Sequence, residues 1–341
     1  MTVAVPWPSE LSGPYAWTVP GKLMVAGEYA VLRDGGVAVA CAVGRVVEVR
    51  VHPGAPRVAT VTAFGKVAAA GWDDDPAAES GLLAFVTAGL AASERSGLSR
   101  CDAGMDFTVH AQVGAAKVGV GTSAAVTVAA VLAALGPGGL DAARIRQVTE
   151  LAVAVHARLQ GGRGSGYDIG AIAHGGAIAW HRTPDRATAL PWPAGVCAAA
   201  LWSGQPAATA EQLQRPAPDP AALDRIDAAA RDLLQAWHAG GPPLLDAIRA
   251  CEAAFTHAAT GARHLANPAL AALASLVGAS GGIARTSGAG GGDCLIAWCS
   301  DRSQRTALVA AAGIRGFPCV ALLPEDLAQP RARLLDPKGG A

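Results

Sequence analysis

The stretch Lys117-Val118-Gly119-Val120-Gly121-Thr122-Ser123-Ala124-Ala125-Val126 combines two closely spaced glycines, two hydroxyls and the start of a segment rich in alanine and valine. Glycine has no Cβ atom, so the backbone N–H groups of such a loop can approach a phosphate closely. A helix that begins at the hydroxyls adds unpaired N–H groups and a partial positive charge, and both favour an anion. With a lysine just upstream, the stretch predicts a loop that binds the phosphates of a nucleotide.

This loop differs from the two most familiar nucleotide-binding motifs. It does not end in the Gly-Lys-Ser/Thr of the P-loop. It also lacks the third glycine of the dinucleotide fingerprint, and no acidic residue follows convincingly at the required spacing. The stretch therefore predicts a phosphate loop of another kind.

The composition excludes several classes of protein. The 341 residues are 51% hydrophobic, which places the chain among globular proteins with a large core. Lys and Arg together number 27, as do Asp and Glu, and no basic cluster is present, so we expect no nucleic-acid partner. No apolar run reaches membrane-spanning length, and residues 1–10 carry no secretion signal, so we expect no membrane partner and a cytoplasmic location.

The cysteines and lysines carry further information. The seven cysteines form no Cys-x-x-Cys pair, which predicts buried free thiols rather than a zinc site or a disulfide framework. The chain has four lysines against 23 arginines, and a lysine in such a background can mark a place that needs a compact point charge. Lys22 and Lys117 fall in glycine-bearing motifs, although chance explains this equally well.

Hydrophobic patterning predicts both strands and helices, so we expect an α+β fold. Residues 37–51 are rich in β-branched side chains and predict two strands joined by a turn near Gly44. A stretch with prolines and a glycine at 191–195 predicts a boundary between two domains, 1–194 and 195–341. The other predicted elements are strands at 104–111, 176–181, 196–202, 294–299 and 317–323 and helices at 79–95, 207–214, 219–239, 242–260 and 301–312, followed by a loosely held tail.

Two helices are predicted directly after the phosphate loop. They cover residues 122–135 and 141–159, and Asp141 is placed to be the N-cap of the second. A glycine-rich turn at 161–166 then leads into a short helix that contains Asp168.

Two further glycine-bearing motifs accompany the phosphate loop. The first runs from Val19 to Leu32 (VPGKLMVAGEYAVL) and places Lys22 beside a turn near the N-terminus. The second runs from Thr286 to Cys294 (TSGAGGGDC). One glycine cluster alone most often marks only a turn. Three in order, each with particular polar residues, favour a ligand-binding site.

Together the three motifs resemble those of the GHMP kinases, the family of galactokinase, homoserine kinase, mevalonate kinase and phosphomevalonate kinase. The family pattern has Pro-Gly-Lys and Gly-Glu-[His/Tyr]-Ala-Val near the N-terminus, then a loop Pro-x-x-x-Gly-[Leu/Ile]-[Gly/Ser]-Ser-Ser-[Ala/Gly], and a last loop such as Gly-Ala-Gly-Gly-Gly. The resemblance extends from about residue 18 to residue 323. The usual Pro, Leu and Ser of the family pattern are replaced by Ala115, Val120 and Thr122. These exchanges do little to weaken the resemblance.

Within the family the chain is most similar to the phosphomevalonate kinases, because of Lys117 before the loop, Gly164–Asp168 (GSGYD) and the ending Gly-Gly-Gly-Asp293-Cys. The resemblance implies a two-domain GHMP kinase fold, with an N-terminal part like ribosomal protein S5 domain 2 and a ferredoxin-like C-terminal part. It implies phosphoryl transfer from ATP to mevalonate 5-phosphate, with Mg²⁺ as a cofactor, and it allows a homodimer. Mevalonate kinase, another GHMP small-molecule kinase, a decarboxylase relative and a catalytically silent metabolite sensor remain alternatives.

The resemblance also assigns roles to individual residues. Asp168 aligns with the family's catalytic aspartate, which accepts the proton of the attacking oxygen or orients that oxygen while holding Lys22. Lys22 would stabilise charge on the transferred group. Thr122 would bond a phosphate oxygen and Ser123 would support Mg²⁺, although simple capping of the helix is the alternative role for both hydroxyls. The implied nucleotide-binding residues are Lys117, Gly119, Val120, Gly121, Thr122, Ser123 and Ala124.

The implied acceptor carries a phosphate and a carboxylate, and both need cationic partners. Lys117 and Arg163 are the candidates because both flank glycine loops, although an ordinary surface arginine at position 163 is an equal alternative. Glu28 would assist Mg²⁺ or substrate placement, with a purely structural acid as its alternative. The remaining implied substrate contacts are Tyr29, Ser165, Ser287 and Gly288.

Overall fold

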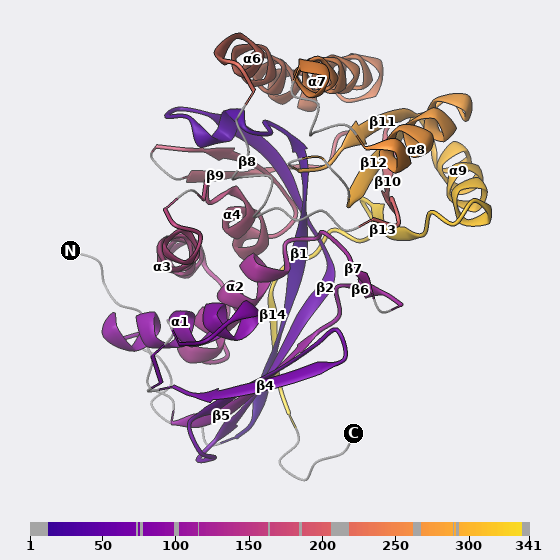
Figure 1. Cartoon of the computed structure of the whole chain (residues 1–341). Coiled ribbons are helices and arrows are strands. Elements are labelled where there is room, and N and C mark those ends of the chain that lie inside the picture. Colours follow the sequence, from indigo (N-terminus) through magenta and orange to yellow (C-terminus); the bar gives the residue numbers. More distant parts are fainter. Residues whose placement is uncertain are drawn as a thin grey trace.

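The computed structural model contains a large and a smaller β-sheet with helices packed against them, and a short two-stranded sheet of β6 (Gln112–Val113) and β7 (Ala116–Lys117) (Figure 1). It describes residues 13–335 with gaps at 73, 76–77, 99–101, 115, 163, 184–185, 206–217, 262–266, 289 and 291–292. The long strands β1 (Tyr15–Ala26) and β2 (Val37–Pro53) run through the larger part, and the smaller sheet lies to the right of their upper ends in Figure 1. Among the described residues, no helix is long and apolar enough to cross a lipid bilayer.

The larger sheet is built around the antiparallel pair β1 and β2. Its strand order is β14-β1-β2-β5-β3-β4, and β8 pairs with β2 and with β9. The bounds of these strands are Val58–Ala63 for β3, Lys66–Gly71 for β4, Ala103–Val109 for β5, Ala177–His181 for β8, Arg186–Leu190 for β9 and Arg331–Leu334 for β14.

Helix α2 (Thr122–Leu135) lies at the centre of the larger part. All of its residues except Ser123 are buried. Its side chains are apolar on every side, as expected for a helix that is surrounded by protein. The helix packs against β1, β2 and three other helices, so the loop that precedes it is anchored in the core. These helices are α1 (Gly81–Arg95), α3 (Ala142–Leu159) and α4 (Tyr167–His174).

Several predicted elements of the larger part are confirmed. Helix α2 covers the predicted residues 122–135, and α3 begins after Asp141, whose carboxylate accepts a hydrogen bond from the Arg144 N–H at 2.8 Å. The short helix after the glycine-rich turn is α4, and Asp168 lies in its first turn.

Three expectations for the larger sheet are wrong. Gly44 forms no turn between strands: β2 continues through it, with a φ of 63° and an irregularity in the pairing with β1. Lys22 lies within β1 rather than beside a turn, because the residues on both sides of it are buried and pair with β2. The tail is not loose at Arg331–Leu334, which pairs with Tyr15–Thr18 as the edge strand β14.

The smaller sheet has four antiparallel strands in the order β11-β12-β10-β13. Strands β10, β12 and β13 confirm the predictions at 196–202, 294–299 and 317–323, while the predicted helix at 207–214 lies outside the described residues. The bounds are Cys197–Trp202 for β10, Ile283–Thr286 for β11, Cys294–Cys299 for β12, Cys319–Leu323 for β13, Pro220–Trp237 for α6, Gly241–Gly261 for α7, Pro268–Ala279 for α8 and Arg302–Ile314 for α9.

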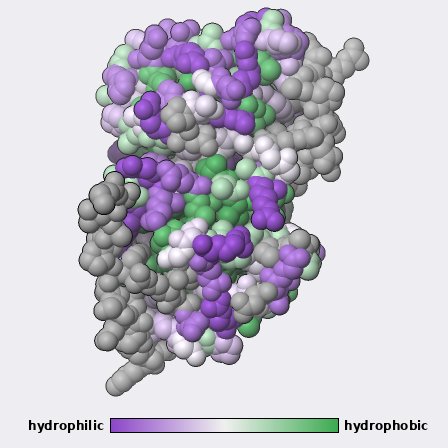
Figure 2. Space-filling view, turned by 90° about the vertical axis from the view of Figure 1, so that its left-hand side faces the viewer, coloured by the Kyte–Doolittle hydropathy of each residue, from purple (hydrophilic) through white to green (hydrophobic). Residues whose placement is uncertain are grey.

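The two parts are connected twice by the chain. The chain enters the smaller sheet after β9, close to the expected boundary at residue 194, and it returns to the larger sheet as β14. The division into domains 1–194 and 195–341 stays a prediction, and β14 crosses it. Figure 2 shows apolar side chains gathered at the centre of one face, with hydrophilic side chains above and below them. Concentrated apolar surface of this kind is typical of ligand-binding or contact faces.

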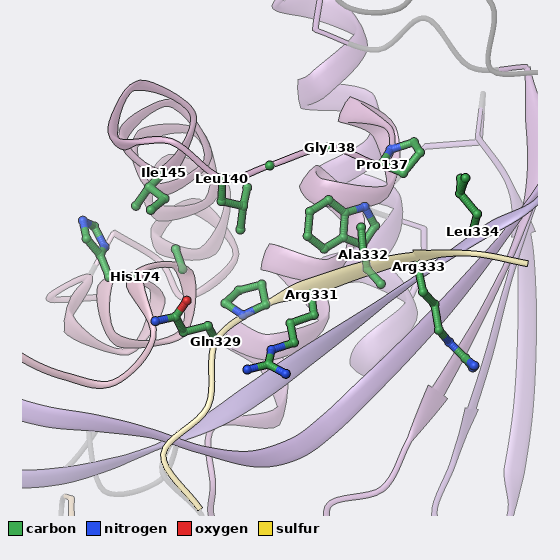
Figure 3. A pocket seen from close by; sticks show the side chains of 14 residues that line it. Pro137, Gly138, Leu140, Ile145, His174, Gln329, Arg331, Ala332, Arg333 and Leu334 are labelled. Carbon is green, nitrogen blue, oxygen red and sulfur yellow. The ribbon is translucent and has the colours of Figure 1, made fainter.

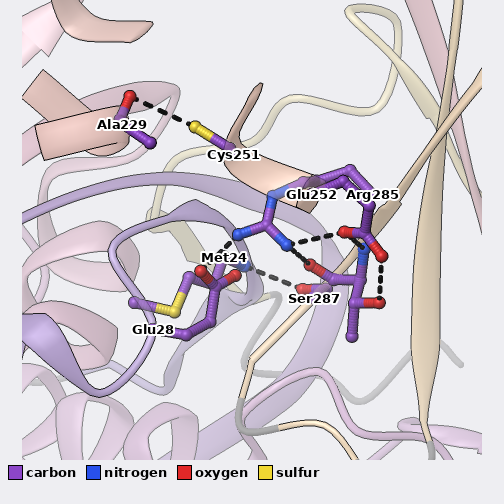
Figure 4. Close-up of polar contacts among 8 residues, drawn as sticks. Met24, Glu28, Ala229, Cys251, Glu252, Arg285 and Ser287 are labelled. Atoms are coloured by element: carbon purple, nitrogen blue, oxygen red, sulfur yellow. Dashed lines mark hydrogen bonds and ion pairs between the residues drawn. The ribbon is translucent and has the colours of Figure 1, made fainter. Parts of the chain in front are cut away.

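A buried ion cluster joins the two parts at the top of β1 (Figure 4). The Arg285 guanidinium of β11 donates to the Glu28 carboxylate and, at 2.9 Å, to Glu252 of α7. Glu252 also accepts from the Thr286 N–H at 2.9 Å and from its hydroxyl at 3.0 Å. Arg285 is 1% exposed, and the attraction of both carboxylates raises its pKa against the opposing effect of burial. The cluster therefore holds the smaller sheet against the larger one.

We expect Arg285→Met to lower the free energy of unfolding by about 3–5 kcal/mol, because the change leaves two carboxylates without their buried counter-charge. Urea unfolding followed by tryptophan fluorescence measures this. Arg249→Ala is the matched control, since Arg249 pairs with Asp246 on the exposed face of α7 and should change stability by less than about 1 kcal/mol. Equal unfolding midpoints for Arg285→Met and the wild type would contradict the role of the cluster.

Candidate active site

The phosphate loop is fixed directly to β1. The backbone N–H of Lys22 donates to the Val120 carbonyl at 2.8 Å. Gly121 is the N-cap of α2 and has a φ of 77°, and a Cβ atom there would lie 2.8 Å from the Cγ atom of Lys22. Both the positive φ and the close contact require glycine at this position.

The start of α2 presents groups that suit a phosphate. No side chain caps the first turn. The hydroxyl of Thr122 is buried and has no hydrogen-bond partner among the described residues. Ser123 follows with a hydroxyl at the edge of the core. An uncapped helix N-terminus with an unpartnered buried hydroxyl fits the phosphate group of a nucleotide.

Lys22 is the partly buried cation of the site. Its Nζ lies 5.5 Å from the centre of the Tyr167 ring, over the aromatic face. Burial alone lowers the pKa of Lys22, but the interactions with Tyr167 and with the Asp168 carboxylate outweigh it, so that the pKa is raised. Lys22 is therefore protonated at neutral pH.

Asp168 faces the same region from the first turn of α4. Its Oδ1 accepts the N–H of Ile169 at 2.9 Å, and its side chain is 19% exposed. The Asp168 carboxylate acts on Lys22 through space and contributes to the raised pKa of the lysine. A direct Lys22–Asp168 pair stays a prediction.

The third glycine motif closes over the same place. The Asp293 side chain lies against the phosphate loop, since a Cβ atom on Gly119 would be 1.9 Å from its Cγ. Asp293 also raises the pKa of Lys22. In the same motif, the Ser287 hydroxyl accepts the N–H of Met24 at 2.9 Å. The structure thus brings all three motifs together around Lys22.

The predicted substrate residues are placed less uniformly. Ser165 is 8% exposed, and its carbonyl accepts the indole N–H of Trp180 at 3.1 Å. Glu28 is 1% exposed, and its carboxylate accepts a hydrogen bond from Arg285. This contact favours the purely structural role that was the alternative for Glu28. Arg163 lies outside the described residues. Tyr29 is 8% exposed with a φ of 58°, and Gly288 has a φ of 85°.

A cavity of about 680 Å³ opens beside the phosphate loop. Lys117 and Ser123 line it, together with the aromatic rings of Phe64 and Phe85. A second cavity, of about 600 Å³, lies between the α2–α3 connection, the end of α4 and β14 (Figure 3). It contains none of the predicted site residues, so the first cavity is the candidate nucleotide pocket.

Two residues of the site were not predicted from the sequence. Tyr167 belongs to a quoted motif but was given no role, although it contacts Lys22. His156 of α3 is 2% exposed, and its ring nitrogens lie 3.1 Å from the Ser123 hydroxyl and 3.8 Å from the Asp168 carboxylate. The sequence does contain an indication of this position. His156 follows Ala152 by four residues, and this helical spacing places the imidazole on the buried side of α3.

The fold is that of small-molecule kinases. The structure resembles a protein from Listeria innocua with a TM-score of 0.81 and 22% identity, covering 95% of this chain and 99% of that one. It resembles a Streptococcus pneumoniae phosphomevalonate kinase, solved with phosphomevalonate and AMPPNP, with a TM-score of 0.75 and 18% identity, covering 94% and 99%. A mevalonate kinase from Methanococcus jannaschii gives a TM-score of 0.72 at 14% identity, covering 96% and 100%. The expected two-part GHMP kinase fold is confirmed.

In sequence, no family model matches the chain. The phosphomevalonate kinase of Streptomyces sp. (strain CL190) is 32% identical to it, over 84% of this chain and 90% of the relative. The chain therefore belongs to the phosphomevalonate kinase branch of the GHMP kinase family.

We expect Gly121→Ala to lower kcat/KM for ATP by about 100-fold or more, because a Cβ atom would displace both Lys22 and the start of α2. A coupled assay of ADP release measures the effect. Gly139→Ala is the control, since a Cβ atom on Gly139 would meet no other atom within 4 Å and its φ is not positive. Wild-type kinetics in Gly121→Ala would show that the loop does not bind the nucleotide.

Proposed function

We propose that the protein transfers the γ-phosphoryl group of ATP to mevalonate 5-phosphate, giving mevalonate 5-diphosphate and ADP. The observation that carries this proposal is the identity with the Streptomyces phosphomevalonate kinase over most of both chains. The convergence of Lys22, Tyr167 and Asp168 beside an uncapped helix supports it, because phosphoryl transfer needs positioning and charge neutralisation above all.

The nucleotide would lie across the start of α2. Its phosphates would take the N–H groups of the loop from Gly119 to Ala124 and the unpartnered hydroxyl of Thr122. The base would enter the cavity of about 680 Å³ between Phe64 and Phe85. Lys117 lines this cavity and would reach the phosphates or the acceptor.

The residues present fit Mg²⁺ held together with ATP. Mg²⁺ prefers oxygen ligands and is usually bound by one or two protein groups plus substrate phosphates. The Ser123 hydroxyl, in the first turn of α2, supplies an oxygen of this kind. When bound, the ion would neutralise phosphate charge during the transfer.

The negative charge of the proposed acceptor favours an electrostatic mechanism. A phosphate monoester has a second pKa of about 6 and is therefore mostly ionised at neutral pH. Removing a proton from the attacking oxygen then contributes less to catalysis than overcoming the repulsion between two anions, the acceptor phosphate and ATP. Lys22, protonated and partly buried, would reduce this repulsion, and Asp168 would orient the acceptor, with proton acceptance as its alternative role.

The remaining assignments are also proposals. Tyr29, Ser165, Ser287 and Gly288 would shape the acceptor pocket, and Glu28 would act through its contact with Arg285. Arg163, outside the described residues, would pair with the acceptor phosphate. We further propose a cytoplasmic enzyme, able to form a homodimer, without a nucleic-acid or membrane partner.

A panel of acceptors tests the proposed activity. We expect ADP release with mevalonate 5-phosphate and at least about 100-fold lower kcat/KM with mevalonate, because mevalonate would leave the proposed cationic partners of the acceptor phosphate unpaired. Turnover on mevalonate alone would identify a mevalonate kinase instead. Release of CO₂ would indicate a decarboxylase, and ATP binding without turnover on any acceptor would indicate a metabolite sensor.

We expect Asp168→Ala to lower kcat at least about 100-fold while ATP affinity stays within a few fold, as for a group that acts mainly in the transition state. Steady-state kinetics and calorimetric ATP titration measure the two effects. Asp301→Ala removes a carboxylate that caps α9 far from the site and is the control. Full activity in Asp168→Ala would refute the assigned role.

A further inference from the structure

His156 connects the two helix starts that form the site. It lies on α3, between Ser123 in the first turn of α2 and Asp168 in the first turn of α4. Its Nε2 is 3.1 Å from the Ser123 Oγ, and its Nδ1 is 3.8 Å from the Asp168 Oδ2. The side chain is 2% exposed, so water does not compete for these contacts.

The surroundings of the imidazole fix its orientation. The Phe85 ring lies 5.2 Å away, tilted by 40°. The amide nitrogen of Gln160, the C-cap residue of α3, is 3.4 Å from the same Nε2 that faces Ser123. An amide nitrogen is only a donor, and a serine hydroxyl can donate. A neutral ring whose Nε2 accepts from these two groups carries its hydrogen on Nδ1, which faces Asp168.

This arrangement has a consequence for Ser123. A hydroxyl has one hydrogen to donate and two lone pairs to offer. When the hydrogen is given to His156, both lone pairs are left for the phosphate loop, where a metal ion and the phosphates would lie. Without the acceptor, the hydroxyl would be free to rotate and to point its hydrogen toward the cation.

The same ring acts on Asp168. At 3.8 Å the contact between Nδ1 and Oδ2 is electrostatic rather than a full hydrogen bond. It faces one carboxylate oxygen while the other accepts the Ile169 N–H at 2.9 Å. The carboxylate is thus held from both sides.

We propose that His156 is a positioning residue that presents the Ser123 oxygen to the magnesium–ATP complex and sets the orientation of Asp168. This role rests on the proposed kinase function, and it adds a link between the metal-holding hydroxyl and the acceptor-orienting carboxylate. When a residue that hydrogen-bonds to a metal ligand is removed, metal affinity or activity typically falls about 10–100-fold.

The test compares His156→Leu with His156→Gln. Leucine removes the acceptor, and glutamine offers an amide oxygen near the position of Nε2. Calorimetric titration of ATP with and without Mg²⁺ gives the gain in affinity that the ion provides. We expect His156→Leu to reduce this gain about 10-fold or more and kcat/KM about 10–100-fold, and His156→Gln to restore most of both.

Two further variants keep the result decisive. His174→Leu is the control, since the His174 ring contacts the Gly170 carbonyl of its own helix at 3.0 Å and should leave the Mg²⁺ effect unchanged. If His156→Leu does not fold, His156→Asn replaces it, because its shorter amide cannot reach Ser123 and should behave worse than His156→Gln.

The proposal fails if the leucine variant keeps the wild-type Mg²⁺ effect. It also fails if the glutamine variant loses activity and unfolding free energy together with the leucine variant, since that pattern belongs to a purely structural histidine. The nucleotide titrations need no acceptor. Failure of the acceptor panel would therefore refute the proposed substrate and leave the result on His156 intact.

Discussion

The hydrogen bond from the Lys22 N–H to the Val120 carbonyl joins the first strand of the protein to the phosphate loop, and the arrangement of the site depends on it. It places a partly buried ammonium group beside the uncapped start of α2, with no space for a side chain at Gly121 between them. Because α2 is buried on almost every side, neither partner can shift without disturbing the core. The cation and the anion-binding helix start are thus held in a fixed relation before any ligand arrives.

The smaller sheet completes the site from the opposite side. The Arg285 cluster and the Ser287–Met24 hydrogen bond attach β11 and its following loop to β1. The loop then brings Asp293 against Gly119, where its charge acts on Lys22. A buried ion cluster is a weak source of net stability, but it strongly disfavours arrangements in which one partner is lost. The cluster therefore acts mainly to specify how the two parts meet.

The sequence predicted the elements whose signals are local. Helix α2 follows from its Ala/Val composition, and the start of α3 follows from the Asp141 cap. The expectation of a turn at Gly44 failed because a glycine inside a strand also accommodates a bulge, and only the pairing with β1 distinguishes the two. The edge strand β14 depends likewise on a partner more than 300 residues away. His156 was missed for the same reason, since its partners Ser123 and Asp168 lie on other helices.

The site residues also explain why a lysine rather than an arginine fits at position 22. The ammonium group lies 5.5 Å from the centre of the Tyr167 ring and close to the loop, where a Cβ at Gly121 would already touch the lysine stem. A planar guanidinium needs more room and spreads its charge over a fork, whereas an ammonium concentrates it at one point. Transfer between two phosphates concentrates negative charge on the moving group, and a compact cation held in low dielectric opposes that charge most effectively. The partly buried Lys22, whose pKa is raised by Tyr167 and Asp168, meets this requirement, and the rate of transfer then depends on how accurately α2 and α4 hold the reactants around it.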